Sequence, residues 1–225
     1  MNIISLKNIY YKYSQSKEWT LENISICFKK GEITIILGPN GSGKTTLMKI
    51  ASLIYKPIKG DVYVDNKNYW SLEESEKLLI RRKITYVHEK AVILKGSVID
   101  NIIYGLRIRG MDKESAIKKA IEILNELEIN DILHKNALEL SAGQSQIISL
   151  ARALVLEPLF LFIDEPFSHL DKSKKMKVID ILKRIKKERG IIISLHEESL
   201  VEKISPDNLV EIENGRIVNI KTFQY

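Results

Sequence analysis

The feature that most constrains this chain is a glycine-rich segment between an apolar run and a helical pattern. It reads Gly38-Pro39-Asn40-Gly41-Ser42-Gly43-Lys44-Thr45-Thr46 and matches the pattern G-x-x-x-x-G-K-[ST] in full. The run 33–37 has the length of a strand, and the apolar residues that follow the segment recur at helical spacing: Leu47, Ile50, Ala51 and Ile54. Glycines let backbone N–H groups approach an anion, and the start of a helix attracts negative charge. This order predicts a phosphate-binding loop; a glycine turn with a chance Lys-Thr pair is the alternative.

Two acidic residues close a second apolar run and supply chemistry that a bound nucleoside triphosphate requires. Residues 159–163 are apolar, and Asp164 and Glu165 follow them. Lys44 can reach the β- and γ-phosphates, while the Thr45 hydroxyl and the Asp164 carboxylate suit Mg²⁺. Glu165 is then placed to polarise the attacking water as a general base. Two acids that simply begin a loop after a core strand are the alternative.

Short apolar runs alternate with helical patterns along the rest of the chain. Nearly continuous apolar runs, typical of parallel strands covered on both faces, lie at 33–37, 84–87, 159–163 and 191–195. Shorter, partly alternating strands are expected at 3–9, 24–28 and 61–64. Residues 209–212 and 216–220 around Asn214-Gly215 predict a hairpin. The pattern is that of an α/β chain with a β-rich first part and a helical insert at about 90–140.

Two helices in the second half are expected from apolar residues that fall on one face. The first face consists of Ala116, Ala120, Ile121, Leu124 and Leu127, and the second of Met176, Ile179, Leu182 and Ile185. Lysines lie opposite the second face, and Gly190 is placed to end that helix.

Composition excludes several other classes of protein. The chain has 225 residues, of which 44% are hydrophobic and 28% charged, so we expect a folded globular protein and not a disordered one. A single cysteine, Cys27, cannot form an internal disulfide, and no apolar run approaches the roughly 20 residues of a membrane-spanning helix. The first residues lack the features of a signal peptide, which predicts a cytosolic protein. The net charge of +6 fits a nucleic acid, an anionic membrane or a phosphorylated ligand.

A segment between the phosphate loop and the acidic pair resembles the signature sequence of the ATP-binding-cassette (ABC) ATPases. It reads Leu140-Ser141-Ala142-Gly143-Gln144, where the family usually has LSGGQ, and the resemblance extends over nearly the whole chain. It implies that this segment binds the γ-phosphate of an ATP held by a second subunit. Ser141 is also suited to cap the helix that follows. Ala142 replaces a glycine, and we expect its methyl group to weaken closure around the phosphate.

Two further segments resemble loops of the same family. The sequence Ser168-His169-Leu170-Asp171 resembles the D-loop, usually SALD, and the resemblance places Asp171 among the ATP-binding residues. His169 replaces a small residue there, and we interpret it as tolerated variation. His196 follows the run 191–195 and matches the switch histidine, which contacts the γ-phosphate and helps to orient the attacking water. For an isolated histidine, a structural or exposed position is the alternative.

Two further positions compare with the ABC family: Tyr13 matches its pattern, and Glu89 departs from it. Tyr13 resembles the aromatic residue that stacks on adenine, although Tyr10 and Tyr11 lie close by and an aromatic on an edge strand is the alternative. Glu89 stands where the family usually has the glutamine that ligates Mg²⁺ and couples the site to the membrane subunit. A carboxylate also binds Mg²⁺ but adds negative charge beside ATP, so we expect altered metal affinity or slower closure. His88 is an alternative ligand at the preceding position.

The helical insert at about 90–140 indicates which kind of ABC ATPase the chain resembles. Residues 92–110 resemble importer ATPases, most of all those of oxyanion uptake systems for tungstate, molybdate or phosphate. The implied fold is an α/β P-loop NTPase of ABC type, with a mixed parallel sheet core, an antiparallel β subdomain and a helical subdomain. We expect one ABC ATPase domain over 1–225. Residues 1–89 and 140–225 would form the RecA-like core with the β subdomain, and 90–140 the helical subdomain.

The resemblance also implies partners and cofactors. These are ATP and Mg²⁺, a second copy of the chain around two ATP molecules, transmembrane permease subunits, and a solute-binding protein in the full system for an oxyanion, metal or sugar. The protein would then lie peripherally on the cytoplasmic face of the membrane. Lys44 meets a phosphate of ATP, and the other lysines solvate the surface or face an anionic membrane, so no nucleic acid is expected. The alternatives are an exporter ATPase, a DNA-repair cassette and a nucleotide-gated regulator that does not hydrolyse ATP. DNA-repair cassettes carry long coiled-coil insertions, which do not fit into 225 residues.

Overall fold

The core of the protein is a six-stranded sheet, seen in a computed structural model that describes residues 1–223. The strand order is β10-β9-β3-β8-β7-β6, and all neighbours run parallel except β9 and β10, which form the predicted hairpin. The strands are β3 (Ile33–Leu37), β6 (Ile84–Val87), β7 (Phe160–Asp164), β8 (Gly190–Leu195), β9 (Asn208–Glu213) and β10 (Arg216–Thr222). Strands β3, β7 and β8 are buried along their whole length, which confirms that their continuous apolar runs are covered on both faces.

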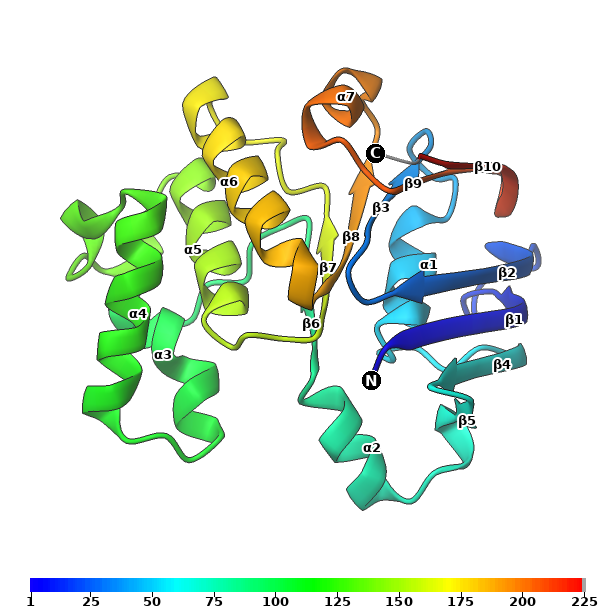
Figure 1. Ribbon diagram of the computed structural model, residues 1–225, viewed down its shortest axis with the longest axis horizontal. Coiled ribbons are helices and arrows are strands. Elements are labelled where there is room, and N and C mark those ends of the chain that lie inside the picture. Colours follow the sequence, from blue (N-terminus) through cyan, green and yellow to red (C-terminus); the bar gives the residue numbers. More distant parts are fainter. Residues whose placement is uncertain (224–225) are drawn as a thin grey trace.

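A second sheet is antiparallel and has four strands in the order β2-β1-β4-β5. They are β1 (Ile3–Tyr11), β2 (Leu21–Lys29), β4 (Lys59–Val64) and β5 (Lys67–Asn68). Helix α1 (Lys44–Ala51) lies between the two sheets (Figure 1). Its buried residues Leu47 and Met48 join one hydrophobic cluster with Ile4 of β1 and Ile36 of β3. The helix that begins at the phosphate loop is therefore held from both sides.

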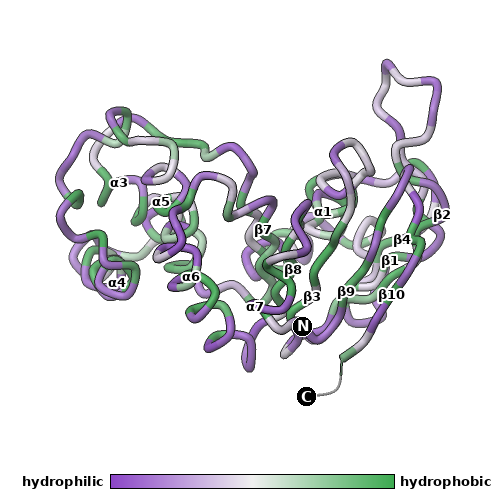
Figure 2. The backbone as a smooth tube through the Cα atoms, turned by 90° about the horizontal axis from the view of Figure 1, so that it is seen from above, coloured by the Kyte–Doolittle hydropathy of each residue, from purple (hydrophilic) through white to green (hydrophobic). Residues whose placement is uncertain are grey.

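The remaining helices gather mostly on the other side of the central sheet. They are α2 (Glu74–Arg81), α3 (Val98–Ile108), α4 (Lys113–Leu127), α5 (Ala142–Leu154), α6 (Lys172–Ile185) and α7 (Val201–Ile204), with short 3₁₀ turns at Tyr69–Ser71, Asn130–Ile132, Ala137–Glu139, Lys186–Glu188 and Glu198–Leu200. Figure 2 shows α3, α4 and α5 at one end of the molecule and β1, β2 and β4 at the other, with β3, β7 and β8 between them. One continuous hydrophobic cluster joins α3, α4 and α5 to β3, β7 and β8. No helix of residues 1–223 is both long and apolar enough to cross a membrane.

Three details of the predicted helices are wrong. Helix α1 ends at Ala51, so Ile54 lies beyond it and is exposed. Ile121 is also exposed, whereas Ala116, Ala120, Leu124 and Leu127 form the buried face of α4. Gly190 does not end α6, which stops at Ile185, but begins β8. A β-carbon at Gly190 would lie 2.5 Å from the Phe160 ring, so close packing and not a helix cap requires glycine there.

The parallel strands bring the predicted functional segments to one edge of the sheet. Strand β3 ends at the phosphate loop, β7 at Asp164, and β8 at Leu195, directly before His196. Strand β6 ends at Val87, two residues before Glu89. Because these strands are neighbours in the same direction, their carboxyl ends share one edge, which is where ligands bind in open α/β sheets.

Candidate functional site

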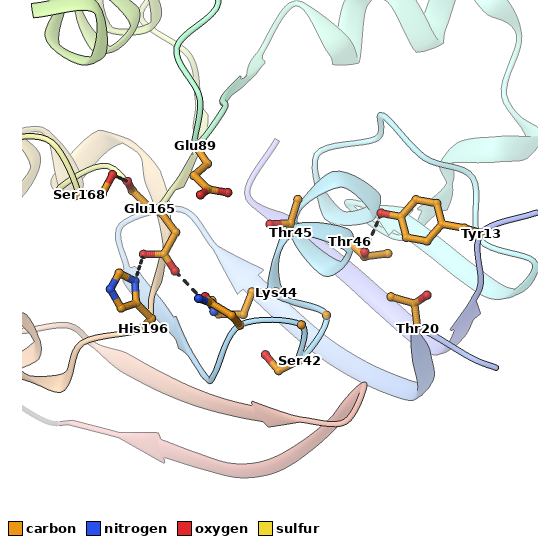
Figure 3. Close-up of a pocket in the computed structure, with 13 residues that line it drawn as sticks. Tyr13, Thr20, Ser42, Lys44, Thr45, Thr46, Glu89, Glu165, Ser168 and His196 are labelled. Carbon is orange, nitrogen blue, oxygen red and sulfur yellow. Dashed lines mark hydrogen bonds and ion pairs between the residues drawn. The ribbon is translucent and has the colours of Figure 1, made fainter. Parts of the chain in front are cut away.

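A cavity of about 430 Å³ opens at this edge of the sheet. Its lining combines the phosphate loop with residues from four other segments: Tyr13, Thr20, Asn40, Gly41, Ser42, Gly43, Lys44, Thr45, Thr46, Glu89, Glu165, Ser168 and His196. Figure 3 shows Glu165 between Lys44 and His196 on one side of the cavity and Tyr13 on the other. The structure thus brings together most of the residues that sequence reasoning selected.

Lys44, Glu165 and His196 form a connected row of charged and polar groups. Glu165 Oε1 lies 3.5 Å from Lys44 Nζ, and Glu165 Oε2 lies 2.7 Å from His196 Nδ1. Lys44 Nζ also donates to the backbone carbonyls of Gly38, at 2.7 Å, and Pro39, at 3.1 Å. Gly38 and Pro39 line a neighbouring cavity, and their carbonyl oxygens position the Lys44 ammonium group. The ammonium group is buried at the base of the loop, where a phosphate can replace one of its present partners.

Glu165 adopts a backbone conformation that is rare for residues other than glycine. Its φ is 45°, in the left-handed region, which costs about 1 kcal/mol or more. The conformation is held by its N–H, which donates to Ser194 Oγ at 2.9 Å, and by its carbonyl, which accepts from Ser168 Oγ at 3.4 Å. The turn directs the Glu165 side chain back over the end of β7 toward Lys44 and His196 (Figure 3).

Asp164 is buried and accepts three hydrogen bonds. The donors are Thr45 Oγ1 at 2.8 Å, the Tyr86 hydroxyl at 2.7 Å and Ser194 Oγ at 2.5 Å. Burial, followed by the nearby Asp164 charge, raises the pKa of Tyr86 far above its ordinary value, so the phenol stays protonated and donates. Tyr86 and Ser194 carry no motif and were missed. Ser194 lies directly opposite Asp164 in the pairing of β7 with β8, and Tyr86 lies on β6, the other neighbour of β7.

The residues at the end of β7 fit a magnesium ion that is shared with a phosphate. Thr45 Oγ1 and Asp164 Oδ2 are adjacent oxygen donors, which Mg²⁺ prefers. Within residues 1–223, no group of three or more His, Cys, Asp and Glu residues could hold a metal ion. A hard cation here therefore needs additional oxygens, as nucleotide phosphates and water provide. Glu89 lines the same cavity and is exposed; Figure 3 shows its carboxylate near the middle of the site, between Glu165 and Thr45.

Tyr13 lies just beyond the end of β1 and is partly exposed at the rim of the cavity. Its hydroxyl is hydrogen-bonded to Thr46 Oγ1 at 3.0 Å, and its ring makes T-shaped contacts with the rings of Tyr11 and Tyr55. Tyr10 and Tyr11, the neighbouring candidates, do not line the cavity. Thr20, which sequence reasoning missed, lines it next to the loop because a backbone bond from its N–H to the Tyr11 carbonyl, 2.8 Å long, ties it to the end of β1.

The signature-like segment lies outside the cavity of its own chain. Ser141 caps α5 in a capping box with Gln144, in which each side chain accepts from the other residue's N–H. A β-carbon at Gly143 would lie 2.6 Å from the His169 carbonyl oxygen, so the signature helix starts against the loop 168–171. Ala142 is exposed, and Asp171 caps α6 by accepting from the Lys174 N–H. Neither Asp171 nor residues 141–144 reach the cavity of the same chain.

Comparison with known proteins identifies the family. A sequence profile described as "ABC transporter" matches residues 21–168. An uncharacterized ABC transporter ATP-binding protein of Methanocaldococcus jannaschii is 33% identical over 224 residues, which cover 97% of this chain and 99% of the relative. The chain belongs to the ABC transporter ATP-binding family. It is accordingly an ATPase subunit of a transporter, and such cassettes act with transmembrane permeases and form dimers.

Other relatives of this ABC cassette belong to uptake systems. The tungstate uptake system ATP-binding protein of Peptoclostridium acidaminophilum is 35% identical, covering 95% of this chain and 96% of that protein. A methionine import ATP-binding protein of Francisella tularensis is 32% identical, covering 97% of this chain but 63% of that protein. Among solved structures, a dimeric ATP-binding cassette in a post-hydrolysis state bound to ADP and Pi matches with a TM-score of 0.90 at 27% identity, covering 99% of both chains. The expected ABC fold is confirmed.

Proposed function

We propose that this chain binds ATP in the cavity at the end of the parallel strands and hydrolyses it there to power solute import. The observation that carries the proposal is the row formed by Lys44, Glu165 and His196 beside the phosphate loop. In this proposal, the cation, the carboxylate and the imidazole lie beside the γ-phosphate and the attacking water.

Each residue of the row has a distinct role. Lys44 leaves its carbonyl partners for the β- and γ-phosphates, and the N–H groups of the loop bind the remaining phosphate oxygens. Glu165 accepts the proton of the attacking water, while His196, held 2.7 Å from Glu165, orients that water and the γ-phosphate. Thr45 and Asp164 would hold Mg²⁺, which neutralises phosphate charge when it is bound. Tyr13 offers its ring to the adenine at the rim.

A second copy of the chain supplies the other half of the site in this proposal. Residues 141–144 combine a serine hydroxyl, a glycine and a helix N-terminus, which suit a phosphate, yet they lie outside their own chain's cavity. Two copies placed head to tail would bring each such segment onto the partner's nucleotide, with ATP between them. The dimeric cassettes among the similar structures support this arrangement.

The variant Glu165→Gln tests the catalytic assignment. It keeps the shape of the side chain but removes the base, so we expect turnover to fall by about 100-fold or more while ATP binding persists. ATP should then hold the variant as a dimer, which light scattering after gel filtration detects. Glu202→Gln is the matched control, because Glu202 is exposed and does not line the cavity. Turnover near the wild-type rate in Glu165→Gln contradicts the proposal.

The direction of transport rests on the relatives. The tungstate uptake and methionine import proteins both match over nearly all of this chain. This match favours the import of a small solute, and an oxyanion is one candidate. In such a system the chain would lie at the cytoplasmic face of the membrane, bound to permease subunits and served by a solute-binding protein. Co-purification of the membrane subunit identifies the system, and recovery of an exporter permease would overturn the proposed direction.

Glu89 favours a second candidate, a cassette that hydrolyses ATP slowly and acts mainly by nucleotide-gated closure. Its carboxylate lines the same cavity as Glu165, so two acidic side chains face the triphosphate. A single-turnover measurement with excess protein separates the candidates. Complete conversion of bound ATP to ADP within seconds supports a working motor, and persistence of bound ATP supports the gated form.

A further inference from the structure

The C-terminal hairpin contacts the phosphate loop at two places, Gly38 and Ser42. Strand β9 runs parallel to β3 and pairs Glu211 with Leu37, the last residue before the loop. Beyond this pair, the Ile212 carbonyl oxygen lies 2.2 Å from where a β-carbon at Gly38 would be. The hairpin therefore touches the first residue of the loop, about 170 positions earlier in the chain.

The hairpin turn reaches the other end of the loop. Gly215 donates its N–H to the Ser42 carbonyl at 3.0 Å, and its own carbonyl accepts from the Glu22 N–H at 2.8 Å. One residue of the turn thus connects the phosphate loop to β2. The sequence alone gives Asn214-Gly215 only the role of a hairpin turn.

Glycine at 215 is required for more than its turn conformation. Its φ is +74°, and a β-carbon there would lie 2.5 Å from the Thr20 carbonyl oxygen. A β-carbon at Gly43, the residue before Lys44, would lie 2.9 Å from the same oxygen. Thr20 is fixed through its N–H on Tyr11. Two glycines therefore pack against the same carbonyl oxygen, and a side chain at 215 must displace Gly43, Thr20 or the turn.

We propose that Gly215 is a positioning residue for nucleotide binding, which sets the conformation of the phosphate loop through Ser42 and Gly43. This proposal rests on the proposed function of the cavity. Displacing the loop moves the N–H groups that bind phosphates in both the ground state and the transition state. A loss of this kind raises KM and the dissociation constant for ADP and leaves kcat unchanged, because it removes binding energy uniformly.

The test compares Gly215→Ala with Gly110→Ala. Gly110 has a φ of +92°, so alanine meets the same backbone penalty, but apart from its chain neighbours no described residue has an atom within 4 Å of the added β-carbon. We expect Gly215→Ala to raise the dissociation constant for ADP about tenfold, with kcat at saturating ATP within about twofold of wild type. Gly110→Ala should lower the melting temperature slightly and leave ADP binding unchanged. Equal ADP affinity in folded Gly215→Ala and Gly110→Ala overturns the proposal.

Asparagine separates backbone conformation from close packing. Asparagine tolerates the left-handed region, so Gly110→Asn should restore the stability that Gly110→Ala loses. Gly215→Asn should not restore ADP binding, because its β-carbon still meets the Thr20 carbonyl. Recovery of wild-type ADP affinity in Gly215→Asn would show that the turn conformation alone matters.

Deuterium exchange of the wild-type protein tests the proposal even if the Gly215 variants fail to fold. ADP should slow deuterium exchange in the peptide that contains Gly215 as well as in the phosphate loop, since the two are hydrogen-bonded. Protection of the loop without protection of the turn overturns the proposal. Absence of ATP hydrolysis by the wild-type chain would instead contradict the proposed function, and the ADP binding comparison would stand.

Discussion

Removing the hydroxyl group of Tyr86 tests whether the strand β6 stabilises the buried carboxylate at the end of β7. The Tyr86 hydroxyl donates to Asp164 Oδ2 at 2.7 Å, and that oxygen also accepts from Thr45. Phenylalanine keeps the ring and leaves Asp164 with Thr45 and Ser194 as donors. Because the raised pKa of Tyr86 keeps the phenol protonated, the bond is present through the neutral and mildly alkaline range.

The size of the effect follows from the burial and charge of the acceptor. A hydrogen bond to a charged group contributes about 1.5–3 kcal/mol, and Asp164 is only 1% exposed, so water does not replace the lost donor. We expect Tyr86→Phe to lower the free energy of unfolding by about 2 kcal/mol. The chain offers a matched control in Tyr69→Phe, because the buried Tyr69 hydroxyl has no hydrogen-bond partner among residues 1–223. That variant should change the free energy of unfolding by less than about 0.5 kcal/mol, or stabilise the protein.

Urea unfolding of both variants, followed by circular dichroism, measures these values, and the slope against denaturant shows whether the unfolded state has changed. The two free energies should differ by about 1.5 kcal/mol or more. Equal values for Tyr86→Phe and Tyr69→Phe would refute the reasoning, because the hydroxyl would then contribute nothing through Asp164. The Mg²⁺ dependence of ATP hydrolysis adds a second readout, and it should change in Tyr86→Phe alone.

Three further predictions concern single positions. Asp100→Asn should lower the free energy of unfolding by about 0.5 kcal/mol at neutral pH. Hydrogen bonds from Ser97 lower the pKa of Asp100 in the folded protein, so this stabilisation is present above the unfolded-state pKa and is lost as the pH falls through the folded-state pKa. Urea titrations in acid should therefore give the same free energy of unfolding for variant and wild type. Gly190→Ala should cost about 1–3 kcal/mol in the same assay because its β-carbon meets the Phe160 ring. Glu89→Gln should raise the Mg²⁺ concentration for half-maximal ATP hydrolysis, and an unchanged value would remove Glu89 from the proposed metal site.

The parts of the site that sequence predicts are those in which local chemistry and local structure coincide. Gly38–Thr46 must turn tightly and begin a helix, so its glycines and its Lys-Thr pair are visible within nine residues. Ser141 was expected to cap the helix that follows it, and the structure confirms this cap; the reciprocal hydrogen bond of Gln144 is an addition from the structure. Continuous apolar runs likewise predicted β3, β7 and β8, because burial on both faces leaves no alternation to interpret. Strand β6 was predicted from the same kind of run, although its two middle residues are only half-buried.

Contacts between distant segments escape this kind of reasoning. Gly190 was assigned to a helix end because a glycine shortly after a helical pattern commonly caps it, yet its neighbours are the Phe160 ring and the Lys29 carbonyl. Ile54 continued the spacing of α1, but Leu53 already has a φ of 65° and takes the chain out of the helix. For Gly190 the deciding atoms lie far away in the sequence. For Ile54 the deciding residue, Leu53, lies inside the window, but its left-handed backbone leaves no trace in the spacing of apolar residues.

The same distinction explains why Asp164 was predicted and its supporting residues were not. An acidic residue after an apolar strand is a local signal, whereas Tyr86 and Ser194 acquire their roles only through strand order and register. Once β8 is known to pair with β7, Ser194 falls opposite Asp164 without further assumption. Its hydroxyl then donates to Asp164 and accepts from the Glu165 N–H, so one side chain holds both acids of the site. The geometry of Glu165, the proposed general base, therefore depends on a serine that no motif marks, and Ser194→Ala should lower kcat as well as stability.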